Sequence, residues 1–214
     1  MSYEKRPMSI EKKSFEIITE EMGDAIELCD TTLQPVIKRV IHTTADFEYA
    51  DLLDFSEDAV QSAFSALKEG CKIYCDTNMI VNGLSKNALG SFNCKPYCLV
   101  NDEKVSKEAK QRGVTRSIVG MEYAAKDPQT KVFLIGNAPT ALYTLLEMIE
   151  EGKCEVPALI VAVPVGFVGA AESKEEVIKH NTPYIRVKGR KGGSTVAVAI
   201  LHGLLYQIFQ REGI

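Results

Sequence analysis

The spacing of apolar residues alternates between two patterns along the chain, and this alternation predicts the secondary structure. Short, almost continuous apolar runs predict strands, whereas apolar residues three and four apart predict amphipathic helices. Strands are expected at 72–76, 97–100, 131–135, 158–163 and 184–187. Helices are expected at 10–22, 33–41, 57–69, 106–112, 116–126, 139–151, 174–180 and 194–210. The alternation predicts an α/β fold with three α/β/α layers and a mainly parallel central sheet of about five strands.

Five residues carry signals that begin or end helices. Ser9 and Ser56 are predicted N-caps, because a serine side chain can accept a hydrogen bond from the first turn. Pro139 suits the first turn of a helix, and Gly70 and Gly152 suit C-caps.

Three of the predicted strands end in a glycine-containing turn that opens a helix, at 136–140, 164–173 and 188–195. Right-handed crossovers bring the C-terminal ends of parallel strands to one edge of the sheet, so these loops are expected to converge. Helix starts expose N–H groups and glycine permits close approach, which together favour a ligand with many negative groups. The candidate binding positions in the loops are Asn137, Gly166, Gly169, Gly192 and Gly193.

Composition limits the class of protein. With 214 residues, 45% of them hydrophobic, and no Pro/Gly/Ser-rich linker or repeat, residues 1–214 are expected to form a single domain. The net charge of −4 argues against a general nucleic-acid or membrane-surface binder, so any anion site must be local. No apolar run approaches the ~20 residues that span a membrane. The first residues lack the apolar stretch of a signal peptide, and a cytoplasmic location is expected.

The six cysteines leave two interpretations open. Cys71/Cys75 and Cys94/Cys98 have a spacing that a four-cysteine zinc site allows. However, residues 71–75 look like a strand, and a free cysteine packs well as a small core residue. Reduced structural thiols are therefore the preferred interpretation, and no metal site is predicted.

The three histidines differ in their settings. His42 lies at a predicted helix end among polar neighbours, where it could act as a general acid or base, or simply cap the helix. His180 also ends a predicted helix, where capping is the better interpretation. His202 lies in an apolar helix, which favours a packed or interfacial role.

Cations at loop positions are the candidate ligands for an anion. Arg116 opens a predicted helix, where a positive charge opposes the helix dipole unless an anion is bound nearby. Arg190 and Lys191 lie inside the third glycine loop and are stronger candidates. A surface ion pair for Arg116, and a solvated turn for the other two, remain the alternatives.

Several familiar motifs are absent. The chain has no G-x-x-x-x-G-K-[ST], no G-x-S-x-G and no H-E-x-x-H. The second glycine loop contains 166–169 as G-F-V-G rather than G-x-G-x-x-G, and Glu172 follows closely, which disfavours a pyrophosphate. Dinucleotide binding is therefore weakly supported.

Six blocks of the sequence, spread along nearly its whole length, carry a family resemblance: 14–18, 39–47, 115–117, 136–142, 164–174 and 189–194. Together they resemble the precorrin-8X methylmutase family of corrin biosynthesis. The blocks at 39–47 and 189–194 look most like the cobalt-precorrin-8 branch.

The resemblance implies an isomerase that moves a methyl group from C-11 to C-12 of the macrocycle, giving cobyrinate or the metal-free hydrogenobyrinate. It implies a homodimer with a tetrapyrrole substrate and no separate cofactor. It also implies a single catalytic histidine, which falls on His42, and substrate contacts that fall on Ser14 and Arg39.

The residues fit this implication. A flat apolar ring fringed with carboxylates needs an apolar slot and many scattered donors, which the glycine loops, Arg116, Arg190 and Lys191 could supply. Two other classes remain open: a non-catalytic tetrapyrrole carrier, and a nucleotide-linked oxidoreductase, which the missing fingerprint opposes.

Overall fold

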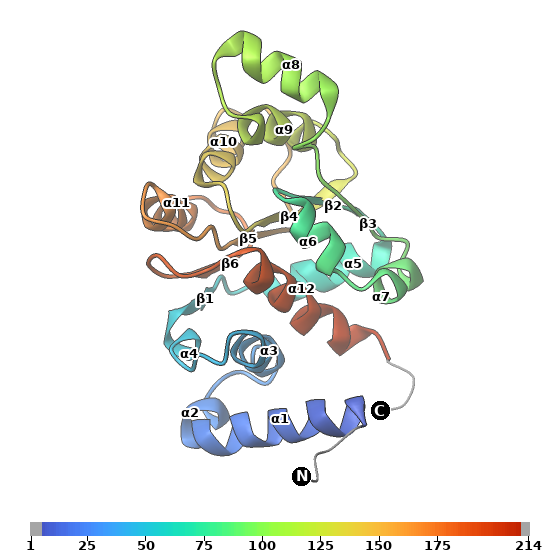
Figure 1. The fold of residues 1–214 in the computed structure, drawn as a ribbon, viewed down its shortest axis with the longest axis vertical. Helices are drawn as coiled ribbons and strands as arrows, with labels where there is room; N and C mark the ends of the chain where they lie inside the picture. The colour runs from blue at the N-terminus through green and yellow to red at the C-terminus, as the bar shows by residue number, and fades with distance from the viewer. Residues whose placement is uncertain (1–5, 211–214) are drawn as a thin grey trace.

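The computed structural model describes residues 6–210 and places a six-stranded sheet at the centre of the molecule (Figure 1). The strands follow the order β1-β6-β5-β4-β2-β3, and every neighbouring pair is parallel except β1 and β6. Their bounds are β1 Leu53–Phe55, β2 Lys72–Cys75, β3 Lys95–Tyr97, β4 Thr130–Ile135, β5 Leu159–Ala162 and β6 Tyr184–Val187. The predicted α/β class and its mainly parallel sheet are confirmed.

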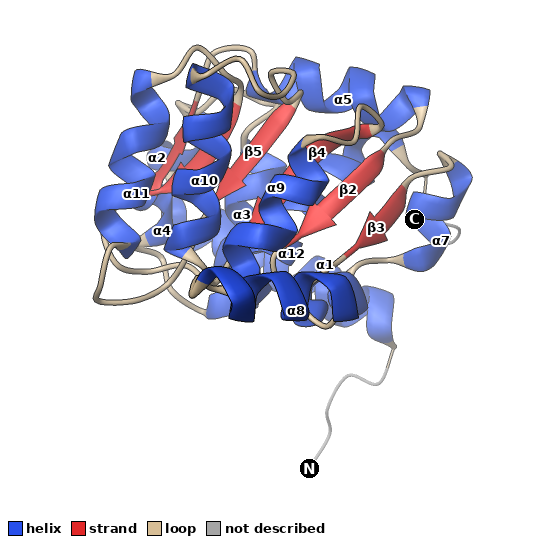
Figure 2. Cartoon of the chain, turned by 90° about the horizontal axis from the view of Figure 1, so that it is seen from above, coloured by secondary structure: helices blue, strands red, loops and turns tan. Residues whose placement is uncertain are grey.

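Helices cover both faces of the sheet. The longer helices are α1 Pro7–Met22, α3 Gln34–Thr44, α5 Ala59–Glu69, α8 Glu103–Arg112, α9 Arg116–Ala125, α10 Pro139–Glu150 and α12 Ser194–Ile208. The shorter ones are α2 Asp24–Glu27, α4 Tyr49–Leu52, α6 Asn78–Gly83, α7 Lys86–Ser91, α11 Ala170–Glu176 and the 3₁₀ turn Val177–Lys179. Helices α9, α10 and α11 lie over one face, whereas α5 and α12 lie over the other, with α3 beneath α12 and α1 beneath α3 (Figures 1 and 2).

Strand β4 shows why the sequence produces this layered core. Its alternate residues Val132 and Leu134 belong to the core on the α5/α12 side, whereas Phe133 and Ile135 belong to the core beneath α10. All four side chains are buried. A strand covered on both faces is apolar at every position, which is why it reads as a continuous apolar run.

One strand and several short helices were not expected from the sequence. Strand β1 has three residues and pairs antiparallel with β6, Leu53 lying opposite Val187. Three residues are too few to reveal a period. The pairing is reinforced by an ion pair between Asp54 and Arg186, which lie opposite each other in the register. Helices α2, α4, α6 and α7 are likewise only four to six residues long.

Both predicted serine caps are wrong. Helix α1 begins at Pro7, ahead of Ser9, with Arg6 as its N-cap. Proline suits a first helical turn, so the helix starts there. Helix α5 begins at Ala59 with Asp58 as N-cap. The hydroxyl of Ser56 instead accepts a hydrogen bond from the Tyr184 N–H at 2.9 Å, at the start of β6.

Other element boundaries differ as well, and two of them have a structural reason or consequence. The strand expected at 97–100 lies at Lys95–Tyr97, because β3 pairs with β2 in the register Lys72 opposite Lys95. The helix expected at 174–180 begins earlier, at Ala170, and ends in the 3₁₀ turn.

Candidate functional site

The three glycine loops meet at the C-terminal edge of the sheet, as the sequence predicted. The Val165 N–H bonds to the Gly136 carbonyl at 3.4 Å, which joins the second loop to the first. The Gly166 N–H bonds to the Arg190 carbonyl at 3.2 Å, which joins the second loop to the third. The loops after β4, β5 and β6 therefore form one surface.

Glycine is required where these loops cross. A Cβ on Gly192, which has φ 149°, would lie 2.2 Å from the Val163 carbonyl oxygen. A Cβ on Gly136 would lie 2.8 Å from the Cα of Ser194, the first residue of α12. Such contacts are closer than real Cβ atoms tolerate, so any side chain at either position would push the loops apart.

A buried carboxylate accepts hydrogen bonds from the backbone N–H groups of the first loop. Asp76, at the end of β2, accepts hydrogen bonds from the N–H groups of Gly136, Asn137 and Ala138 at 3.0, 2.8 and 2.7 Å. Burial raises the pKa of this carboxyl, and the three N–H bonds oppose that rise. The expectation that this loop presents its backbone to a ligand is therefore wrong, because the protein supplies the anion itself. The exposed side chain of Asn137 still faces outward.

A small cavity lies beside the start of α12. Its volume is about 220 Å³, and Arg39, Thr43, Met79, Ser194, Thr195 and His202 are among its lining residues. The Ser194 hydroxyl contacts the hydroxyl of Thr77 at 2.9 Å, and Thr77 caps α6. The cavity thus joins α3, which carries His42, to the glycine-loop edge.

His42, Arg39 and Phe15 form a cluster between α1 and α3. The imidazole of His42 lies 5.2 Å from the Phe15 ring, measured between centroids. The Arg39 guanidinium lies 5.0 Å from the same ring and 4.8 Å from the ring of Tyr206 on α12. His42 is exposed in the last turn of α3, so its ring is open to a ligand. Ser14 adjoins Phe15, and its hydroxyl bonds to the Ile10 carbonyl at 2.9 Å.

Arg39 already has a carboxylate partner. Its Nη2 donates to Oε1 of Glu11 at 2.9 Å, and its side chain is only 14% exposed. The stacking on two rings and the ion pair together hold α1, α3 and α12 in place. A second cavity of about 340 Å³ lies on the other side of Arg39, lined also by Phe15 and Tyr206.

Lys191 ties the third glycine loop to the end of α3. Its Nζ donates to Asp46 and to Glu48, the latter at 2.7 Å. These hydrogen bonds raise the pKa of Lys191 well above its usual range. Lys191 was expected to be available to an external anion, but it serves as an internal link between this loop and the segment after His42.

The neighbouring Arg190 points outward from the same loop. It is exposed, and its guanidinium carbon lies 5.5 Å from the centroid of the exposed Phe167 ring in the second loop. Of the two cations predicted in this loop, Arg190 is the one that lies open to a ligand.

Lys174 is buried beneath the loops and was missed from the sequence. Its side chain is inaccessible to solvent, and its Nζ donates to the Lys191 carbonyl at 2.7 Å. Burial, followed by the nearby charge of Arg186, lowers the pKa of Lys174 to about 8. Nothing in the sequence distinguishes this lysine from its charged neighbours on α11, because its burial depends on β6.

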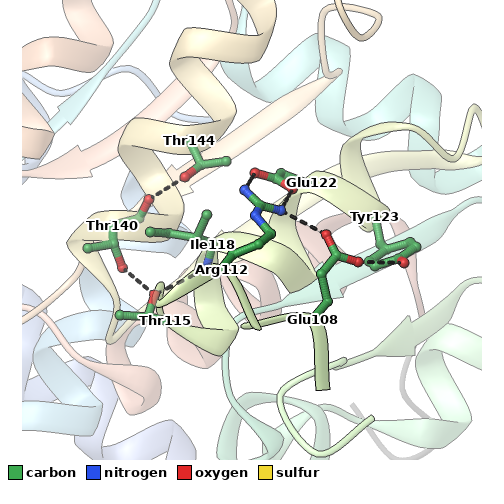
Figure 3. Close-up of polar contacts among 8 residues, drawn as sticks. All are labelled: Glu108, Arg112, Thr115, Ile118, Glu122, Tyr123, Thr140 and Thr144. Carbon is green, nitrogen blue, oxygen red and sulfur yellow. Dashed lines mark hydrogen bonds and ion pairs between the residues drawn. The ribbon is translucent and has the colours of Figure 1, made fainter. Parts of the chain in front are cut away.

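Arg116 approaches the site from the opposite side of the sheet. It is exposed at the start of α9, where Thr115 caps the helix and contacts Thr140 of α10 at 3.4 Å (Figure 3). Helices α8 and α9 are joined by Arg112, whose guanidinium binds both oxygens of Glu122 at 2.6 and 2.7 Å (Figure 3). Arg116 is thus placed near the first glycine loop by a braced helix pair.

The remaining histidines and cysteines lie outside the cluster around His42 and Phe15. His202 is half-buried on α12, accepts a hydrogen bond from the Ser85 N–H at 3.0 Å and stacks on Tyr206, which confirms a packed role. His180 follows the 3₁₀ turn. All six cysteines are free, and across residues 6–210 no three His, Cys, Asp or Glu side chains gather where they could hold a metal ion.

Comparisons with known proteins give a consistent result. The family model described as precorrin-8X methylmutase matches residues 9–207. A cobalt-precorrin-8 methylmutase from Leptospira interrogans is 44% identical over 92% of each chain. One from Salmonella typhimurium is 42% identical over 97% of this chain and 99% of its own. A crystal structure of the precorrin-8X methyl mutase from Thermus thermophilus is 38% identical, covers 92% of this chain and 94% of its own, and has a TM-score of 0.85.

This chain belongs to the precorrin-8X methylmutase family. Its members are isomerases, and the resemblance seen in the sequence blocks is confirmed.

In this methylmutase-family chain, the site residues predicted from the sequence fall into three groups. Ser14, Arg39 and His42 lie on α1 and α3, whereas Gly166, Gly169, Arg190, Gly192 and Gly193 lie in the second and third loops. Arg116 and Asn137 lie at the starts of α9 and α10. Lys191 joins the first group to the second, and Asp76 and Lys174 are the supporting residues that only the structure reveals. No helix within residues 6–210 has both the length and the apolar character to cross a bilayer.

Proposed function

We propose that this protein moves the methyl group from C-11 to C-12 of cobalt-precorrin-8, giving cobyrinate. The observation that carries the proposal is the exposed His42, held beside Arg39 on the helix that Lys191 ties to the glycine loops. A group that can transfer a proton thus stands next to a surface built for a large ligand. The cobalt form is favoured because the Leptospira and Salmonella relatives both carry that name.

The chemistry of the substrate matches the groups at this edge. A corrin precursor is a flat apolar ring fringed with carboxylates, so it requires aromatic or aliphatic surface and scattered cations. Phe15 supplies a partly exposed ring and Phe167 a largely exposed one, and Arg116 and Arg190 supply exposed cations. Charge-assisted bonds from arginine to carboxylate give geometric specificity as well as affinity. We expect Arg190 and Arg116 to bind carboxylates on different sides of the ring.

His42 acts on the conjugated ring during the methyl shift. In a metal-free substrate, a proton passed from the imidazole to a ring nitrogen would draw electron density from the ring and return after migration. In the cobalt substrate those nitrogens bind the metal, so His42 acts by hydrogen bonding to the ring edge or by its charge. The reaction is an isomerisation with no net redox change, and it requires no nicotinamide or flavin.

One incubation separates this function from its competitors. The purified protein is mixed with cobalt-precorrin-8, and the visible spectrum is followed without any added cofactor. A change to the product spectrum supports the methylmutase. Bound but unchanged pigment would instead indicate a tetrapyrrole carrier. A spectrum that changes only after a nicotinamide is added would indicate an oxidoreductase.

We also propose that the active form is a cytoplasmic homodimer, on the strength of the family resemblance. Helix α12 is apolar on much of its circumference, a character that would also suit an interface. However, Val196, Ile200, Leu201 and Leu205 are buried within a single chain, which accounts for that character. Light scattering should give twice the 23.6 kDa mass of one chain. A monomer at micromolar concentration would contradict the dimer.

A further inference from the structure

Two large apolar side chains stand exposed at the tip of the second glycine loop. Phe167 is 83% exposed and Val168 is 91% exposed, and Val165 just before them is 47% exposed. Single exposed apolar residues are ordinary, but adjacent ones that form a patch are typical of binding surfaces. Gly166 and Gly169 flank the pair with φ angles of 149° and 72°, which turn the backbone so that both side chains project outward.

Two contacts join the tip to the candidate site, one at its base and one at its side. The Gly166 N–H bonds to the Arg190 carbonyl at 3.2 Å, and the Arg190 guanidinium lies beside the Phe167 ring. The next residue, Lys191, binds Asp46 four residues after His42. The tip, the exposed arginine and the helix that carries His42 are therefore consecutive members of one chain of contacts.

The two cavities lined by Arg39 do not account for a ligand as large as a tetrapyrrole. Their volumes are about 220 and 340 Å³. Pockets for drug-sized ligands already occupy roughly 300–1,000 Å³. A macrocycle bound at His42 must extend beyond these cavities and cover further apolar surface. The Phe167–Val168 tip is apolar surface of this kind, and it has a cation at its side.

We propose that Phe167 and Val168 bind the apolar face of the macrocycle while Arg190 binds a carboxylate on its rim. This inference rests on the proposed function and adds two substrate-contacting residues to it. The pairing follows from the chemistry of the ligand, since a ring with carboxylates at its edge presents an apolar face and a negative rim side by side. Phe167 and Arg190 present the complementary apolar surface and positive charge.

The first test measures kinetics on the intact protein. Burying an aromatic ring and a valine against a ligand is expected to strengthen binding by about ten- to a hundred-fold. The double variant Phe167→Ala/Val168→Ala should therefore raise KM for cobalt-precorrin-8 by at least about ten-fold, with kcat within about three-fold of wild type. Val156→Ala is the matched control, because Val156 is 54% exposed and precedes β5 at the opposite end of the strand. Its KM should be unchanged.

The second test uses the absence of tryptophan from the chain. Phe167→Trp introduces a sole indole at the tip, and Val156→Trp does so at the control site. On saturation with hydrogenobyrinate, the metal-free product, the emission maximum of the first variant should move to shorter wavelength. The emission maximum of Val156→Trp should not move. The wavelength of the maximum is compared because it reports burial of the indole, whereas emission intensity would also report energy transfer to the pigment.

Several results would overturn the inference. An unchanged KM in the double variant, or a fall in kcat without a change in KM, would remove the tip from substrate binding. Indole emission from Phe167→Trp that is already blue-shifted without ligand, and moves on dilution, would place the tip against a second copy of the chain. Wild-type protein that neither binds nor converts the pigment would overturn the proposed function together with this inference. An active wild type with unaffected variants would overturn the inference alone.

Discussion

The glycine loops and the α1–α3 face meet at the same edge of the sheet but are held by different interactions. The loops are fixed by backbone hydrogen bonds and by two buried charged side chains, Asp76 and Lys174. The α1–α3 face is fixed by side-chain stacking of Arg39 on Phe15 and by its ion pair with Glu11. The first region is held by buried hydrogen bonds, whereas the second is held by side-chain contacts between helices.

This difference separates two tasks that a methylmutase site must combine. A large rigid ligand is best bound by groups on a rigid base, because little ordering is then lost on binding. A group that acts on the ring must remain open to the ligand, and His42, the residue proposed for that role, is exposed in the last turn of α3. Substitutions in the loop base should therefore affect stability, and those on the helix face should affect turnover.

The largest expected effect is on turnover, at His42. His42→Ala should lower kcat by at least about a hundred-fold, since general acid–base help is worth ~10²–10⁴ in rate. The variant should still bind the corrinoid product, which its colour after purification will report. His42→Asn should behave similarly, because an amide can donate a hydrogen bond but cannot deliver a proton.

The matched control is His180→Asn, in the turn before β6, which should keep wild-type turnover. Near-normal turnover by His42→Asn on the cobalt substrate would exclude proton transfer and leave a hydrogen-bond role. Near-normal turnover by His42→Ala would remove the catalytic assignment altogether.

The next effect concerns Lys174 and depends on pH. Its pKa is about 8 in the folded protein and 10.5 in the unfolded chain, so the unfolded chain binds more protons between those values. Stability of the wild type should therefore rise as pH increases from about 8 to about 10.5, by at most about 3 kcal/mol. Lys174→Met should lack this rise.

Urea unfolding of both proteins, at about pH 7 and about pH 10, measures the difference. The control Lys104→Met removes an exposed lysine from α8 and should keep the wild-type slope over this window. A parallel pH dependence in wild type and Lys174→Met would mean that Lys174 is not buried as an ammonium.

Substitution of Asp76 tests, at a single pH, the hydrogen bonds that hold the first glycine loop. Asp76→Asn keeps the shape but turns one acceptor into a donor that faces backbone N–H groups. The free energy of unfolding should fall by about 2 kcal/mol, because hydrogen bonds to charged groups are worth ~1.5–3 kcal/mol and a buried mismatch adds to the loss. Asp127→Asn removes only a partly exposed ion pair with Lys72 and should cost less than about 1 kcal/mol. Equal losses in the two variants would show that the loop base is not specially anchored.

The smallest effect is on affinity, at the two exposed arginines. Arg190→Ala and Arg116→Ala should each weaken binding of the corrinoid product by about ten-fold or more, with the fold intact, because each loses a charge-assisted bond of ~1.5–3 kcal/mol. Titration by visible absorbance measures this, and circular dichroism checks the fold. Unchanged affinity in both variants would leave the rim of the ring without its proposed cations.

The strands and loops could be predicted because they depend on local pattern. The runs at β4 and β5 are apolar throughout, and each ends in a glycine turn, so a parallel sheet with converging loops follows from the sequence. Strand β1 could not be predicted, because it exists only through its pairing with β6.

The supporting residues of the site could not be predicted for a similar reason. Asp76 meets amides sixty or more residues further along the chain, and Lys191 meets carboxylates more than 140 residues away. A local sequence pattern cannot identify partners that lie so far apart in the chain. His42 itself was found through its polar surroundings and a family resemblance, whereas the contact of its ring with Phe15 was not predicted.

Strand β3, at one end of the sheet, limits how two copies of the chain could associate. Among residues 6–210 it pairs with β2 alone, so its other side is an edge of the sheet. Lys95 is exposed there, and Pro96 lacks an N–H to donate. A lysine and a proline on a three-residue edge discourage strand-by-strand extension from one molecule to the next. A sheet that continues from one molecule into the next through the β3 edge is therefore disfavoured.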